Sequence, residues 1–443
     1  MDRREITKIA VPVSLESLLQ LGLGFINQII VGTLGVTAIA AVGLANNTFF
    51  IGVLCLSVFA SGCSIMAAKA LGQNDQKALA HVSSVSLGFA LLLSLLIAMP
   101  IAASGVSFLR LVGATDAIAT EGGAFLSVLA LSLPLMTAGF VVSAVFRTIG
   151  QPRVPLVVTV VTLSITPILA WLFVVYFAWG AIGAAWATLI TQSLRAVLLL
   201  GLLYASRWGI RFALPNWAQS RLILLEMMPL VLPLFVTEIV FSSGLFVYAL
   251  IAEKVGTAEL AILQIVSTLE TVFFAGGIGL HTAATILVSK AVGGSERKEV
   301  MRVASSLWHV GLKVGLGLGL LFALSGFLVP ILFPNTTVQV QQFAFWGVIL
   351  NACFIPVKFA NMIGFGVLSG GRDTRFLLFS DVITVVVVGL PISYFLALNL
   401  GLWGVFLGRL LGEESVRLAM IAWRYRSGLW FKLDSNGINA QQP

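Results

Sequence analysis

Long uninterrupted apolar stretches recur along the whole sequence, and each is long enough to cross a membrane as a helix. A spanning helix needs about 20 predominantly apolar residues. Soluble domains carry about 25% charged residues, whereas this chain is 59% hydrophobic and only 10% charged. Apolar and polar residues do not alternate as they do in a membrane β-barrel. The sequence therefore predicts an all-α polytopic membrane protein and excludes a soluble or disordered chain.

Twelve transmembrane helices are predicted, joined by short loops that contain Gly, Pro, Asn or charged residues. The expected ranges are 7–32, 44–71, 79–106, 121–148, 154–178, 181–205, 226–252, 261–290, 301–330, 341–369, 376–399 and 402–424.

Basic residues lie very unevenly on the two sides of these helices. Of the 26 lysines and arginines, all but six fall on the side of the N-terminus. Arg110 and Lys254 lie on the opposite side, and the other four lie within helices. Because cytoplasmic loops carry the excess of basic residues, we expect a multi-pass protein of the plasma (inner) membrane with both termini in the cytoplasm. This distribution also accounts for the net charge of +8 without a nucleic-acid partner.

The two halves of the chain repeat each other at a constant offset of 221 residues. The matched pairs include Pro12 and Pro233, Gly35 and Gly256, Lys69 and Lys290, Gly150 and Gly371, and Gly183 and Gly404. One offset that holds from the first helix to the sixth indicates a duplicated six-helix unit. Parallel repeats of this kind form transporters, with the substrate site between the repeats.

The repeat also predicts where the domains lie. We expect an N-lobe at residues 1–205 with helices one to six, and a C-lobe at 226–426 with helices seven to twelve. The segment 206–225 is basic and amphipathic, which is typical of a linker along the cytoplasmic membrane surface. Residues 427–443 are expected to form a cytoplasmic tail.

Several stretches resemble one transporter family when they are taken together and in order. They are the first helix from Pro12 to Gly35, AAKALGQNDQKA at 67–78 with its counterpart SKAVGGSERKE at 289–299, LSGGRDTR at 368–375, GAIGAAWAT at 180–188 and GLWGVFLGR at 401–409. The chain in this respect resembles the multidrug and toxic compound extrusion (MATE) transporters. The resemblance implies two pseudo-symmetric six-helix lobes in a V. It also implies efflux of organic cations or other amphipathic compounds in exchange for H⁺ or Na⁺.

One position departs from the family pattern. Bacterial members usually carry an aspartate fifteen residues after the proline of the first helix, and this chain carries Asn27 there. Because asparagine cannot release a proton, an ion-coupled mechanism needs an ionisable group elsewhere. Acids within spans are therefore the first candidates, since burying a charge in the bilayer is costly.

Two acids near the middle of their helices are the leading candidates for ion coupling. Glu238 lies in the seventh helix, with Ser242 one turn later on the same face. Glu16 lies in the first helix, on a polar stripe with Gln20 and Asn27 that must face protein or water. The alternative for each acid is a structural hydrogen bond or ion pair, and Lys358 is a possible partner of Glu238.

A second polar face is predicted in the eighth and tenth helices. Glu270 shares a stripe with Gln264 in the eighth helix, and Asn351 shares a face with Lys358 in the tenth. Lys358 can pair with Glu238 or with Glu270, and an ion pair broken by substrate or ion is a possible switch. Helix packing is the alternative. Further acids and arginines of the eleventh and twelfth helices are interpreted as structural partners: Asp381, Arg409, Glu413 and Arg417.

These observations predict a secondary antiporter that works as a monomer. No catalytic, phosphate-binding or metal-binding motif is present, so we expect no enzymatic activity, no cofactor and no metal. The alternative within the same superfamily is a flippase for lipid-linked precursors. Such substrates are anionic and need several cations in their cavity, whereas the predicted spans hold four cations and six acids. A membrane scaffold without transport activity is a further alternative.

Overall fold

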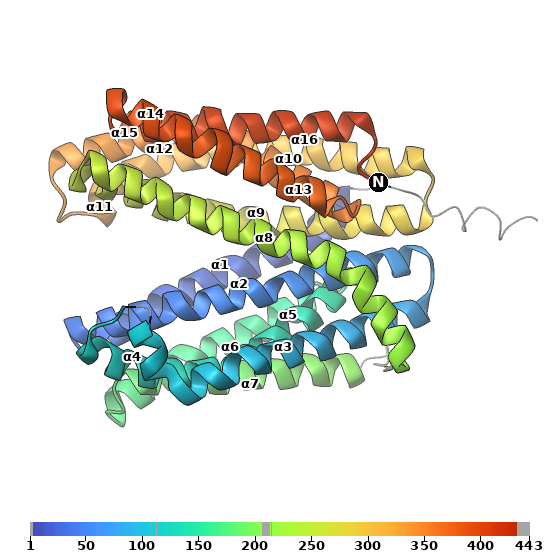
Figure 1. The fold of residues 1–443 in the computed structure, drawn as a ribbon, viewed down its shortest axis with the longest axis horizontal. Helices are drawn as coiled ribbons and strands as arrows, with labels where there is room; N and C mark the ends of the chain where they lie inside the picture. The colour runs from blue at the N-terminus through green and yellow to red at the C-terminus, as the bar shows by residue number, and fades with distance from the viewer. Residues whose placement is uncertain (1–2, 112, 206–212, 214, 432–443) are drawn as a thin grey trace, which may run out of the picture. The chain divides into compact units, whose positions relative to one another are not determined.

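The computed structural model describes residues 3–111, 113–205, 213 and 215–431, and these residues form a chain of helices (Figure 1). In the first half the helices are α1 (Arg3–Gly32), α2 (Val36–Gly72), α3 (Gln76–Leu111), α4 (Asp116–Ala130), α5 (Ser132–Thr148), α6 (Arg153–Trp171), the π-helical η1 (Leu172–Tyr176) and α7 (Ala181–Ala205).

In the second half they are α8 (Trp217–Val255), α9 (Thr257–Gly294), α10 (Arg297–Ser325), the 3₁₀ turn η2 (Gly326–Leu328), α11 (Val329–Leu332), α12 (Val338–Gly370), α13 (Thr374–Asp381), the π-helical η3 (Val382–Gly389), α14 (Leu390–Leu400), α15 (Leu402–Leu407), the π-helical η4 (Gly408–Ser415) and α16 (Val416–Ser427).

Each predicted span corresponds to one helix or to one run of consecutive helical segments. Among the described residues, ten helices are long and apolar enough to cross a membrane, and the pair α4 and α5 adds an eleventh. The twelfth predicted span is the run α15–η4–α16, residues 402–427. This run is polar for a spanning helix because Arg409, Glu413, Glu414 and Arg417 fall within it.

The predicted helix at 121–148 differs from the structure in two ways. It begins earlier, at Asp116, and it bends by 41° at Leu131, where α4 ends and α5 begins. Pro134 provides the physical reason. A proline inside a helix lacks the N–H that would bond the carbonyl four residues earlier, and its ring clashes with that carbonyl, which here belongs to Ala130.

Contacts divide the chain into two compact units. The C-terminal unit comprises Met1–Ser14 and Pro229–Pro443, and the N-terminal unit comprises Leu15–Met228. Both boundaries fall inside helices, in α1 and α8. The segment expected to form the linker lies partly outside the described residues, at 206–212 and 214, and α8 begins at Trp217.

In the N-terminal unit, two glycines allow α3 and α4 to pack backbone against backbone. A Cβ atom on Gly123 would lie 2.5 Å from the Cα of Val106, and a Cβ on Gly105 would lie 2.4 Å from the carbonyl oxygen of Gly123. Small residues at such crossings are the usual means by which membrane helices approach closely. This contact holds α3 and α4 in one core cluster with Leu109 and Leu126.

In the C-terminal unit, α12 packs along both α9 and α10. Gly366 and Gly370 of α12 approach the backbone of α9 so closely that a Cβ would lie 2.7 Å and 2.8 Å from the carbonyl oxygens of His281 and Thr285. This close packing fixes the faces of α9 and α12 that carry charged side chains.

Candidate functional site

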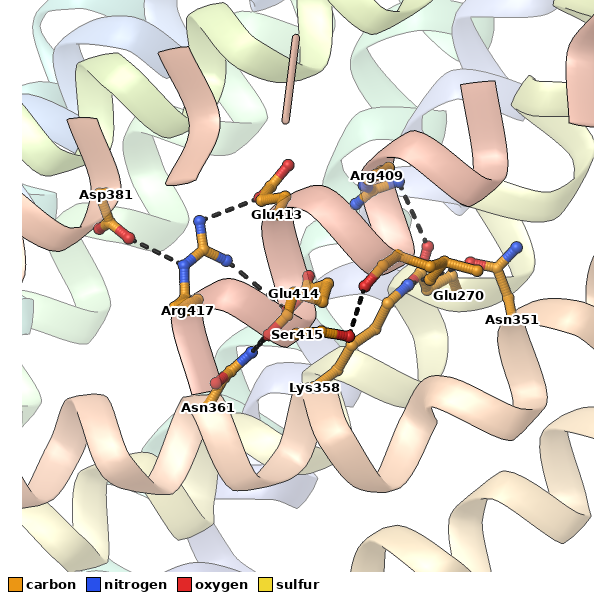
Figure 2. Close-up of polar contacts among 11 residues, drawn as sticks. Glu270, Asn351, Lys358, Asn361, Asp381, Arg409, Glu413, Glu414, Ser415 and Arg417 are labelled. Atoms are coloured by element: carbon orange, nitrogen blue, oxygen red, sulfur yellow. Dashed lines mark hydrogen bonds and ion pairs between the residues drawn. The ribbon is translucent and has the colours of Figure 1, made fainter. Parts of the chain in front are cut away.

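The C-terminal unit contains a buried cluster of charged side chains, which we call the C-terminal charge network (Figure 2). All of its members are buried: Glu270, Asn351, Lys358, Asn361, Asp381, Arg409, Glu413, Glu414 and Arg417. They come from α9, α12, α13, η4 and α16.

One part of the network surrounds Glu270. Lys358 of α12 donates a hydrogen bond to Oε1 of Glu270, and the Nη1 atom of Arg409 lies 3.7 Å from Oε2. Lys358 also donates to Oδ1 of Asn351 at 3.1 Å. Of the two partners expected for Lys358, Glu270 is therefore the one it contacts. The guanidinium of Arg409 also lies 5.9 Å above the ring of Tyr248 on α8.

The other part of the network surrounds Arg417. Its guanidinium lies 2.9 Å from Asp381, 2.9 Å from Glu413 and 3.7 Å from Glu414. Asn361 of α12 donates from Nδ2 to Oε2 of Glu414 at 2.8 Å. One arginine thus links three carboxylates from two neighbouring helical runs.

The π-helical segment η4 carries three members of the network, Arg409, Glu413 and Glu414. A π-helix bonds i to i+5, so it accommodates one more residue per bonded ring than an α-helix. Arg417 follows η4 in α16, so one helical run supplies the arginines and glutamates at 409, 413, 414 and 417. Segments of π-helix inside α-helices are frequent at functional sites.

Charge is unbalanced within the network. Its four carboxylates face three cationic side chains in the part of the chain that the structure describes. Each carboxylate contacts at least one of these cations, but the network as a whole carries one negative charge in excess when all its groups are ionised. Among the described residues there is no group of three or more His, Cys, Asp or Glu side chains arranged to hold a metal.

Glu238 lies on α8 beside this network but does not join it. It is half-buried and forms no ion pair or hydrogen bond with the described residues. The one described charge that acts on it appreciably is that of Asp381, a like charge. Ser242 and Gln264 are exposed, and neither takes part in the described contacts of the network.

In the N-terminal unit, Glu16 is the centre of a second buried ion-pair cluster. Its Oε2 lies 2.7 Å from Nη2 of Arg147 on α5, and its Oε1 lies 2.9 Å from Nη2 of Arg195 on α7. The hydroxyl of Thr159 on α6 donates to Oε1 at 3.1 Å. One carboxylate of α1 thus joins three other helices, and we call this group the Glu16 junction.

A cavity of about 670 Å³ adjoins the Glu16 junction within the N-terminal unit. Thr159 and Arg195 belong to both the junction and the cavity wall, and Gln20 also lines the wall. This volume lies in the range of about 300–1,000 Å³ that is typical of small-molecule sites. Asn27 lies in α1, but its side chain is outside the described part of the structure.

Arg147 and Arg195 are not among the partners that the sequence predicts for Glu16, and Arg417 is predicted only as a structural partner. A signal for Arg195 and Arg417 is present in the sequence, whereas Arg147 falls opposite Leu368 or Ser369 and has none. Glu16 and Glu238, Thr159 and Asp381, and Arg195 and Arg417 are each 222 positions apart. A search for chemistry-bearing residues one position away from the repeat offset would have found all three pairs.

Known proteins are similar to this chain along nearly its whole length. Multidrug resistance protein NorM of Burkholderia vietnamiensis is 28% identical over 446 residues, covering 95% of this chain and 93% of the relative. A protein of Agrobacterium fabrum named as a probable multidrug resistance protein NorM is 26% identical over 434 residues, covering 93% and 91%.

Solved structures show the same fold. One is described as the outward-facing conformation of a multidrug resistance MATE family transporter of the MOP superfamily. It matches with a TM-score of 0.88 and 20% identity over 96% of both chains.

The sequence pattern of the MatE family matches residues 12–172 and 233–395. The two matched segments begin at Pro12 and Pro233, at the repeat offset of 221. The family that the first helix and the interhelical loops resembled is thereby confirmed, and the chain belongs to the MatE family.

Proposed function

We propose that this protein is a secondary multidrug efflux transporter that exports small amphipathic compounds in exchange for protons or sodium ions. Membership of the MatE family supports this function, and so do relatives whose names describe multidrug resistance. The chain acts as a monomer in the plasma (inner) membrane with both termini in the cytoplasm, and it alternates between outward-open and inward-open states.

The observation that carries the coupling proposal is the surplus carboxylate of the C-terminal charge network. An imported H⁺ or Na⁺ neutralises this surplus charge or that of the neighbouring Glu238. Each charge moved inward gains about 2.3 kcal/mol per 100 mV of membrane potential. That energy drives export when ion binding and substrate binding favour opposite states.

Lys358 has a distinct part in this proposal. It contacts Glu270 and Asn351 at the same time, so a change in the protonation of the network alters which partner it favours. The ion pair of Lys358 and Glu270 thus serves as a switch between states.

The test uses proteoliposomes that contain the purified full chain and a fluorescent dye. Rhodamine 123 is a cation, and rhodamine 110 is the same dye with a free carboxylate in place of the methyl ester. A pH gradient or a sodium gradient is imposed separately, and dye movement is recorded. We expect one gradient to drive at least one dye. If neither gradient moves either dye above the level of protein-free liposomes, the antiporter assignment is wrong.

Export of lipid-linked precursors is the second candidate function. It is favoured by the Glu16 junction, where two arginines face one carboxylate, because such precursors carry phosphates. A fluorescent prenyl-diphosphate lipid in the same proteoliposomes, with dithionite to bleach the outer leaflet, separates the two functions. Accelerated loss of fluorescence together with no dye movement would favour the flippase.

A further inference from the structure

The cavity of the N-terminal unit is positively charged. Among the described residues that line it, Arg195 is the one charged side chain, and no aspartate or glutamate faces the cavity. The wall is otherwise built of apolar, aromatic, amide and hydroxyl side chains. A cationic compound would therefore meet a like charge in the described wall of this cavity and no carboxylate there, because Glu16 lies behind Arg195 in the junction.

Arg195 is only partly neutralised by its surroundings. The described charges that act on it are those of Glu16 and Arg147, and Glu16 is shared between the two arginines. Arg195 is 4% exposed, and its Nε has no hydrogen-bond partner in the described part of the chain. The junction therefore holds one positive charge in excess, next to the cavity.

Aromatic and amide groups of the wall complete a site for a flat amphipathic molecule. The guanidinium of Arg195 lies 5.9 Å from the ring centroid of Phe140, which also lines the cavity. Phe49 and Phe125 add further aromatic surface. Gln192 presents an amide whose Oε1 is buried with no hydrogen-bond partner among the described residues.

We propose that this cavity binds amphipathic compounds that carry a carboxylate, with the carboxylate on Arg195 and the apolar body among the phenylalanines. The planar fork of an arginine matches a carboxylate with two parallel hydrogen bonds. The bound carboxylate restores charge balance at the junction, so a compound with a free carboxylate is favoured over the same compound with that carboxylate esterified. This inference rests on the proposed export of small molecules and names the class of substrate.

Equilibrium binding of the two rhodamines to the detergent-purified full chain tests the inference. Fluorescence anisotropy at pH 7.5 gives a dissociation constant for each dye. Rhodamine 110 and rhodamine 123 share the xanthylium body and differ in the carboxylate, which is esterified in rhodamine 123. We expect rhodamine 110 to bind at least tenfold more tightly. Equal affinity, or tighter binding of rhodamine 123, would overturn the inference.

Three variants test the role of Arg195. Arg195→Gln leaves Glu16 paired with Arg147 in a balanced pair. This variant should raise the dissociation constant of rhodamine 110 at least tenfold and leave that of rhodamine 123 unchanged or lower. Arg195→Lys should retain part of the preference because the charge remains. Arg110→Gln is the matched control, because Arg110 is an exposed arginine of the same unit that pairs with Asp116 and does not line the cavity.

Failure of this inference and failure of the proposed function give different results. If ion gradients drive rhodamine 123 but the anisotropy shows no preference for rhodamine 110, the transporter assignment stands and the substrate class is wrong. If rhodamine 110 binds through Arg195 but no gradient moves it, the site is supported and the antiporter assignment fails. If Arg195→Gln binds both dyes as the unaltered chain does, the site is not at Arg195.

Discussion

Lys358 of α12 and Glu270 of α9 form an ion pair that is buried in the C-terminal unit, with side chains 0% and 5% exposed. Removing one member of such a pair costs about 3–5 kcal/mol because it leaves an unpaired buried charge. Arg409 remains 3.7 Å from Glu270, so Lys358→Met should lie at the lower end of that range. The double variant Glu270→Gln with Lys358→Met should recover part of the loss, because neither charge of the pair remains, and only part because Arg409 then loses Glu270 as its partner.

Thermal unfolding of the four proteins in detergent completes this double-mutant cycle. A double variant that is no more stable than Lys358→Met would show that the unpaired charge of Glu270 does not cause the loss of stability in Lys358→Met.

Glu238 should be required for coupled export and dispensable for folding. It is half-buried on α8 and forms no ion pair or hydrogen bond among the described residues, so its amide analogue removes a charge without breaking a described contact. We expect Glu238→Gln to reduce gradient-driven dye movement to the protein-free rate and to unfold at an unchanged temperature. Glu253→Gln, at an exposed position of the same helix, is the control and should retain full transport. Full transport by Glu238→Gln would exclude Glu238 as the coupling acid.

Substitutions of Arg417 and of Asp381 should differ sharply in their effects on the free energy of unfolding, although the two residues form one ion pair. Arg417 links three buried carboxylates, so Arg417→Gln leaves them facing one another and should cost about 3–5 kcal/mol or more. Asp381→Asn removes one carboxylate from a network that already has one in excess. Arg417 keeps Glu413 and Glu414 as partners in this variant, so we expect a clearly smaller loss than for Arg417→Gln. Comparable losses in thermal unfolding would show that the network has no surplus carboxylate.

Gly123 should tolerate no side chain, because α3 and α4 meet there. A Cβ atom would lie 2.5 Å from the Cα and 2.6 Å from the N of Val106, so Gly123→Ala forces the helices apart. Overpacking of this kind costs about 1–3 kcal/mol. Gly88→Ala on α3 is the control, since nothing lies within 4 Å of a Cβ there. It should be neutral or slightly stabilising because alanine has the higher helix propensity. Equal melting temperatures for the two variants would argue against this close packing.

Most of the architecture of the protein can be predicted from the sequence. Apolar run length determines where helices lie because a helix in lipid must satisfy its own backbone and present apolar side chains. The constant offset between Pro12 and Pro233 reveals the duplication, because a duplication preserves residue spacing wherever no insertion follows. Glu16, Glu238, Glu270 and Lys358 stand out for a related reason, since an ionisable side chain inside an apolar run needs a partner or a function.

Only the tertiary structure shows which charged side chains form ion pairs with one another. Periodicity along one helix tells which residues share a face, but it does not report the distance from Glu16 to Arg147 or Arg195, which lie 131 and 179 positions away. The 41° bend at Leu131 and the π-helical η4 alter which faces meet. For this reason the sequence predicts structural ion pairs for Arg417 and Asp381 but does not show that they pair with each other. Packing of distant helices brings them together, because ion pairs depend on distances of a few ångströms that no local pattern encodes.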